Sequence, residues 1–203
     1  MAVKVATFEL ISAAVFASLG AKVLYADQVA KDIIDTHDDV KRRVRKEFGN
    51  EIYLPNGTLD RKRMARTIFL DASLREKLEQ IVHPYVLQVF EEKIQFFRQS
   101  STHGLFIVEA ALHYESGAEE LFDYMIVIDA GEKQRFDRTM RRDGVTRHEI
   151  TQRMQAQMPS KEKAAQADFV IHNNGDRDAL KEKCVFVFRI LESIANSSSG
   201  SEQ

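Results

Sequence analysis

This 203-residue sequence has a single cysteine, no long apolar run and almost no excess of charge of either sign. The single cysteine, Cys184, can form neither an internal disulfide nor a cysteine zinc site, and its apolar neighbours predict a buried side chain. No apolar run reaches the ~18 residues of a membrane span. The 29 lysines and arginines nearly balance 31 aspartates and glutamates, which argues against binding to nucleic acid or an anionic membrane by bulk charge. These features favour a cytoplasmic chain that binds neither nucleic acid nor a membrane, and they leave the oligomeric state open.

The hydrophobic pattern predicts an α/β fold, because short apolar runs alternate with segments of helical spacing. The runs typical of parallel strands covered on both faces are 22–26, 105–108, 125–128 and 169–171. Helical spacing is found at 10–19, 27–48, 73–98, 131–143, 147–157 and 176–195, and a further helix starts at Asp60. For residues 2–8 the sequence allows two assignments, a strand of the sheet or an extension of the first helix. The polar tail at 196–203 is predicted to be disordered.

Three local signals divide the helical segments. Asp27 can cap the start of the helix that follows the first clear strand. Residues 55–57 read Pro-Asn-Gly and predict a turn. Pro84 lies inside a helical segment and marks a kink or a break.

Polar residues follow each predicted strand. Asp27, Glu109 and Asp129 come after three of them, and residues 172–175 (His-Asn-Asn-Gly) come after the last. In parallel α/β sheets ligands bind beyond the carboxyl ends of the strands, so we expect these residues to converge on a site. The alternative for each is a helix cap or a solvated loop.

A cluster of arginines follows Asp129. Arg135, Arg138 and Arg142 have i, i+3, i+7 spacing and share one helix face. Guanidinium groups suit phosphate because each offers a planar fork of donors. The alternative, which composition alone favours, is a solvated charged face paired with nearby acidic residues.

Six segments together resemble the dephospho-CoA kinase family in their order and spacing. They are 19–27, 57–63, 81–84, 108–115, 138–144 and 167–175, and the resemblance covers about residues 13–190. It implies a three-layer P-loop kinase fold with a mostly parallel five-stranded sheet, in a single domain of residues 1–195. A helical substrate-binding insertion is implied at about 28–100 and a lid at about 138–165. The implied reaction uses ATP with Mg²⁺ to phosphorylate the ribose 3′-hydroxyl of 3′-dephospho-coenzyme A, which is the last step of coenzyme A synthesis.

The resemblance also implies catalytic residues. Asp27 matches the family's aspartate that faces the ribose 3′-hydroxyl, a base that orients the nucleophile in phosphoryl transfer. Tyr25 stands where the family has another aspartate. Arg138 and Arg142 match lid arginines that close over the phosphates.

Binding residues are implied in the same way. Arg61 and His83 match the substrate-binding helical region, and Glu109 matches the strand end beside the substrate. Asn173 and Gly175 match a loop near the adenine. For His83, the alternative of a packing residue at a helix end outweighs direct chemistry. No metal-ligand set is apparent in the sequence.

The glycine-rich phosphate loop of the family is not recognisable. The family register places it at Lys4 to Leu10, with Glu9 at the lysine position and Leu10 at the Ser/Thr that binds magnesium. Gly20 is the only glycine in the first 48 residues. Side chains block the conformations that glycine permits, and a glutamate repels phosphate, so we expect weak ATP binding and slow turnover.

Three explanations of the missing loop remain open. The chain is a genuine kinase with an altered N-terminus, through a wrong start site, a frameshift or alternative splicing. Or it is a catalytically dead relative that binds coenzyme A or a protein partner. Or another lysine, Lys4 or Lys22, substitutes for the missing one, although a lysine does not replace a cradle of backbone N–H groups.

Overall fold

The computed structural model describes residues 2–7, 10–100, 104–110, 118–131, 134, 136, 138–140, 147, 151 and 158–197. The chain divides into two compact units, which are each described by themselves. The first unit combines residues 1–24 with 94–203, and the second comprises residues 25–93.

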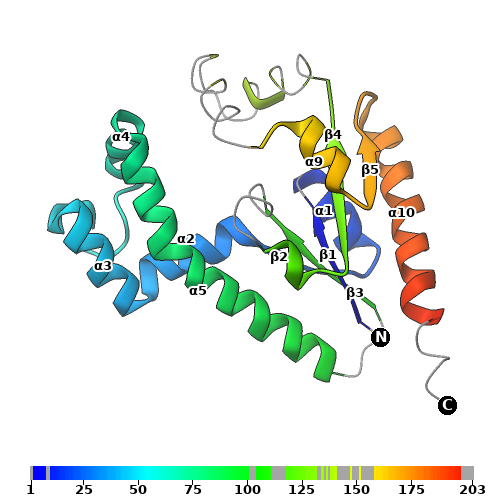
Figure 1. Ribbon diagram of the computed structural model, residues 1–203, viewed down its shortest axis with the longest axis horizontal. Coiled ribbons are helices and arrows are strands. Elements are labelled where there is room, and N and C mark those ends of the chain that lie inside the picture. Colours follow the sequence, from blue (N-terminus) through cyan, green and yellow to red (C-terminus); the bar gives the residue numbers. More distant parts are fainter. Residues whose placement is uncertain are drawn as a thin grey trace. The chain divides into compact units, whose positions relative to one another are not determined.

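The first unit is built on a five-stranded sheet (Figure 1). Its strands are β1 (Ala2–Thr7), β2 (Lys22–Tyr25), β3 (Gly104–Glu109), β4 (Tyr124–Asp129) and β5 (Phe169–His172). The order is β2-β3-β1-β4-β5, and β1 pairs in parallel with both β3 and β4, as β4 does with β5. The segment left open between strand and helix is therefore the central strand. The predicted α/β fold with a mostly parallel five-stranded sheet is confirmed.

Both faces of this sheet are buried, which explains the unbroken apolar runs. Helices α1 (Leu10–Ser18) and α10 (Arg177–Ser197) pack together on one face, where Ile107 of β3 and Leu191 of α10 are fully buried. Cys184 is buried in the same cluster, as its neighbours predicted. Phe106, which points from β3 to the other face, lies 5.3 Å from the ring of Phe97, between centroids.

Short helices complete the described part of the first unit. Helix α9 (Ser160–Gln166) contacts β4, and the 3₁₀ helix η2 spans Glu119–Leu121. The helices predicted at 131–143 and 147–157 lie largely outside the described residues. Helix α10 ends at Ser197, two residues into the predicted tail, whose remaining residues lie outside the described ones.

The second unit is helical. Its elements are α2 (Ala26–Thr36), α3 (Asp38–Phe48), the 3₁₀ helix η1 (Asn50–Ile52), α4 (Arg61–Leu70) and α5 (Ala72–Gln99) as far as residue 93. The predicted turn at 55–57 is present, with the Gly57 N–H bound to the Leu54 carbonyl and a Gly57 φ of 83° that favours glycine. The buried side chains that hold the unit together are Ile33, Ile34, Val40, Val44, Ile52, Tyr53, Leu59, Met64, Ile81, Val82, Val86 and Phe90.

The prediction of one long helix from Asp27 to Phe48 was wrong. The chain breaks at His37, which is extended (φ −81°, ψ 115°), and α3 starts there with Asp38 and Asp39 in its first turn. Acidic residues stabilise a helix N-terminus, so they favour a new start at this point. Asp27 does not cap α2 either, because the N-cap is Tyr25 and Asp27 lies within the first turn.

Helix α5 continues through Pro84, so a break at that residue was also the wrong alternative. Proline removes one backbone hydrogen bond from a helix interior. The buried row Val82, Val86, Phe90 and Ile94 recurs every four residues on both sides of the proline, and its burial offsets that loss. Within the described residues, no helix is long and apolar enough to span a membrane.

Candidate active site

The carboxyl ends of four parallel strands lie along one edge of the sheet. Thr7 at the end of β1 is in register with Glu109 at the end of β3, and Asp129 at the end of β4 is in register with His172 at the end of β5. This edge is where ligands bind in open α/β sheets. The structure therefore places Glu109, Asp129 and the segment after β5 at the edge that the sequence predicted.

The ends of β4 and β5 are tied together. The Nδ1 atom of His172 lies 3.5 Å from Oδ2 of Asp129, and the Asn173 N–H donates to the Asp129 carbonyl over 2.6 Å. The ammonium of Lys183, on α10, donates to the carbonyl of His172 over 2.7 Å. Asn173 is buried, so the turn after β5 starts from a fixed point.

Arg138 binds this same turn. One guanidinium nitrogen donates to the Asn173 carbonyl and another to the Gly175 carbonyl, each over 3.1 Å. The amide of Gln134 donates to the Asn174 carbonyl over 3.1 Å, and the Asn174 side-chain oxygen accepts from the Gly131 N–H over 3.1 Å. The structure thus brings together Arg138, Asn173 and Gly175, three of the residues that the sequence singled out.

The other predicted residues are placed separately. Asp27 is exposed in the first turn of α2, and His83 is half-buried in α5. Arg61 opens α4 and pairs with Asp35 of α2 over 2.6 Å. These three belong to the second unit, whereas Glu109 belongs to the first, so a pocket shared by all of them stays a prediction. Arg142 lies outside the described residues.

Sequence reasoning missed several supporting residues. Asp35 fixes Arg61 and also accepts from the Leu59 N–H over 2.8 Å, although it lies 26 residues before Arg61. Gln134 and Lys183 act on backbone carbonyls. Every residue carries a carbonyl, so no sequence pattern could have identified the acceptors.

The N-terminal segment does not fit a triphosphate cradle. Lys4 and Ala6 pair with Phe106 and Val108 in the ladder between β1 and β3, so the backbone of this segment is committed to the sheet. Only residues 8 and 9 separate the end of β1 from the start of α1, whereas a phosphate loop of the G-x-x-x-x-G-K-[ST] type is several residues long. Leu10 carries no oxygen for Mg²⁺. The described residues also contain no group of three His, Cys, Asp or Glu side chains able to hold a metal ion.

Comparison with known proteins gives consistent matches. A family model described as "Dephospho-CoA kinase" matches residues 5–179. Two relatives named dephospho-CoA kinase are similar over most of their length. The one from Geobacter sulfurreducens is 38% identical over 165 residues, covering 81% of this chain and 83% of the relative. The one from Anaeromyxobacter dehalogenans is 37% identical over 180 residues, covering 88% and 84%.

Solved structures agree with these matches. Dephospho-CoA kinase from Campylobacter jejuni superposes with a TM-score of 0.69 and 26% identity, covering 95% of this chain and 97% of that chain. TT1252 from Thermus thermophilus superposes with a TM-score of 0.72 and 28% identity, covering 94% and 97%.

Proposed function

Since the chain belongs to the dephospho-CoA kinase family, we propose that it transfers a phosphoryl group from ATP to the ribose 3′-hydroxyl of 3′-dephospho-coenzyme A. Its class of activity is that of a kinase, a phosphotransferase. The observation that carries the proposal is the junction of Arg138 with Asn173 and Gly175 at the carboxyl edge of the sheet. The helical segment at about 28–100 holds the substrate, and a lid at about 138–165 covers the nucleotide.

The proposed reaction divides the work among few side chains. The oxygen of the 3′-hydroxyl bonds to the γ-phosphorus of ATP while the carboxylate of Asp27 accepts the hydroxyl proton. The bond between the γ-phosphorus and the bridging oxygen breaks, and ADP leaves with that oxygen. Arg138 and Arg142 offer planar donor forks to the charge that develops on the phosphoryl oxygens. Glu109, Arg61 and His83 hold and orient the nucleoside end of the substrate.

The nucleotide is held weakly in this proposal. P-loop enzymes hold a triphosphate with backbone N–H groups and a lysine, whereas here the backbone of β1 is paired in the sheet and Glu9 stands at the position of that lysine. We therefore expect an ATP dissociation constant well above the micromolar range, and slow turnover. Calorimetric titration with ATP measures the first quantity, and saturable binding in the micromolar range contradicts this part of the proposal.

A coupled assay of ADP release tests the activity itself. ADP must appear only when dephospho-coenzyme A is present, and coenzyme A must accumulate in equal amount. Asp27→Asn should abolish this release, whereas Asp32→Asn, which removes another exposed carboxylate from α2, should leave it within twofold. If the unaltered chain releases no ADP at millimolar ATP, the chain is not an active kinase. A catalytically dead relative that binds coenzyme A then replaces the proposal.

A further inference from the structure

Helix α3 carries an unusual density of positive charge. Residues 41–46 include five lysines and arginines, and four of them, Lys41, Arg42, Arg45 and Lys46, line a hollow of about 430 Å³ together with Asp38 and Asn50. We propose that this hollow binds a diphosphate group, either as the free anion or as part of a larger ligand. The proposal does not depend on kinase activity, because it concerns residues within the second unit alone.

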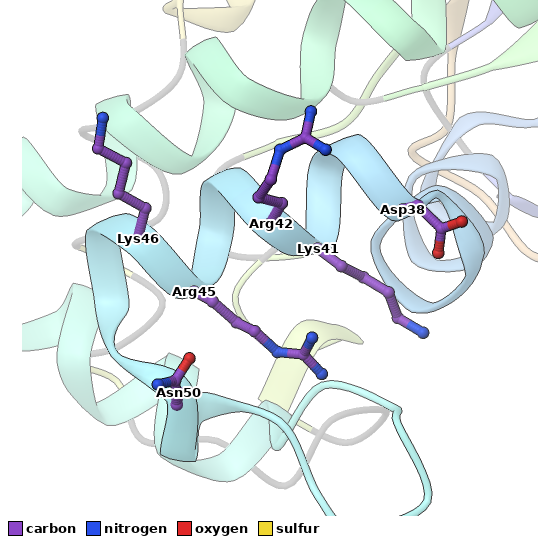
Figure 2. A pocket seen from close by; sticks show the side chains of 6 residues that line it. All are labelled: Asp38, Lys41, Arg42, Arg45, Lys46 and Asn50. Atoms are coloured by element: carbon purple, nitrogen blue, oxygen red, sulfur yellow. The ribbon is translucent and has the colours of Figure 1, made fainter.

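The cations form two rows along the helix. Figure 2 shows Arg42 and Lys46 extending to one side of α3, and Lys41 and Arg45 extending to the other. Each row has i, i+4 spacing, which brings two like charges together on the helix surface. Such like-charge pairs destabilise a helix, so a bound anion relieves a repulsion that the free protein carries.

Most of this charge has no acidic partner. Arg42 pairs with Asp39, one turn before it. Among the described residues, no carboxylate lies within ion-pair distance of Lys41, Arg45 or Lys46. The carboxylate of Asp38 lies at the N-terminal end of the hollow and repels an anion there (Figure 2). The favoured position is therefore toward Arg45, Lys46 and Asn50.

One of the two rows is held in place by an aromatic ring. The guanidinium of Arg45 lies 4.9 Å from the centroid of the Tyr53 ring, and the ammonium of Lys41 lies 6.0 Å from it. Tyr53 is itself buried, and its hydroxyl donates to the Ile34 carbonyl over 3.1 Å. A fixed ring reduces the freedom that these cations would lose on binding a ligand.

The chemistry of the hollow points to more than one phosphate. Four cations in two rows match the three to four negative charges of inorganic diphosphate better than the one or two of a single phosphate, and two rows match the two adjacent phosphates of a diester bridge, each of which carries one charge. The hollow also has the size of a small-molecule site. Two sources offer the same group, namely inorganic diphosphate and the diphosphate bridge of dephospho-coenzyme A.

Calorimetric titration of the full chain tests the proposal with both compounds. Lys41→Gln combined with Lys46→Gln removes one charge from each row, and we expect inorganic diphosphate to bind on the order of tenfold more weakly. The matched control is Lys31→Gln combined with Lys93→Gln, which removes two exposed lysines elsewhere in the same unit and should change affinity less than twofold. Binding to the unaltered chain should also weaken as salt rises.

The two ligands distinguish the source. If the α3 double variant binds both dephospho-coenzyme A and inorganic diphosphate more weakly, the hollow holds the diphosphate bridge of the substrate. If only the affinity for inorganic diphosphate falls, the hollow is a separate anion site. The proposal is overturned if the unaltered chain does not bind inorganic diphosphate at millimolar concentration, or if the control pair weakens it as much as the α3 pair.

Discussion

Arg138 should control how firmly the turn after β5 is closed. Replacing it by glutamine removes two hydrogen bonds from a charged donor, to the carbonyls of Asn173 and Gly175. Hydrogen bonds to charged groups contribute about 1.5–3 kcal/mol each when they are buried. The Arg138 side chain is only half-buried, so we discount the pair to a total of about 1–2 kcal/mol.

That free energy corresponds to a fivefold to thirtyfold increase in opening of the turn. Amide hydrogen exchange measures it directly, because the Asn173 N–H is bound to the Asp129 carbonyl and exchanges when the turn opens. Protection of the Asn173 amide should fall by that factor in Arg138→Gln. Exchange in the β1 and β3 strands should stay unchanged.

Two further variants separate the effect of the donor fork from that of charge. Arg138→Lys keeps the charge but offers a single ammonium, so it should retain part of the protection. Arg189→Gln removes an exposed arginine from α10 and should leave the Asn173 amide unaffected. The reasoning is refuted if Arg138→Gln leaves the protection of the Asn173 amide unchanged, or if Arg189→Gln lowers it equally.

Three predictions concern stability. Burial raises the pKa of Tyr53 to about 12, so the stabilisation that neutral Tyr53 gives is complete below pH ~10 and is lost as pH rises toward 12. In a titration followed by absorbance, one tyrosine should ionise at higher pH than the others. Tyr53→Phe should remove that step. A hydrogen bond from Tyr85 holds the pKa of Asp39 below its usual value, so the contribution of ionised Asp39 to stability is present above pH ~4 and is lost as pH falls further. In Asp39→Asn, the melting temperature should therefore fall less steeply with decreasing pH. An unchanged acid dependence of the melting temperature contradicts this prediction. Leu191→Ala should cost about 2–5 kcal/mol in urea unfolding, against at most ~0.5 kcal/mol for exposed Phe186→Ala, and equal losses would refute the assigned core.

The sheet could be predicted from the sequence because burial on both faces leaves a local trace. The strands β3, β4 and β5 are unbroken apolar runs, and the structure extends each by only a residue or two. The strand β1 was harder, since its six residues include Lys4 and carry only a short alternation. Its assignment comes from pairing with β3, which lies about a hundred residues away in the chain.

The helical errors have local physical reasons. Ile33 and Val40 are both buried and lie seven positions apart, so their spacing fits one continuous helix although the chain breaks at His37 between them. The sequence signal for the break is the pair Asp38 and Asp39, which favours a new helix start. Pro84 was weighted as a helix breaker although the buried row continues on both sides of it. At Pro84 the spacing of buried residues was the better guide, and at His37 the acidic pair was.

The candidate site was predictable in part. Residues that follow strands could be found because the strands could be found, and Arg138 came from helical spacing. The attachment of Arg138 to backbone carbonyls, and the pairing of Arg61 with Asp35, depend on side-chain paths across the fold. Such contacts have no pattern in a single sequence.

The two-residue connection from β1 to α1 has a consequence for any attempt at repair. Exchanging residues within β1 cannot create an anion nest, since the peptide groups of this strand already pair with β3 and β4. A protein engineer would instead lengthen the polypeptide between Thr7 and Leu10, so that the added peptide groups are free to bind the phosphates of a nucleotide.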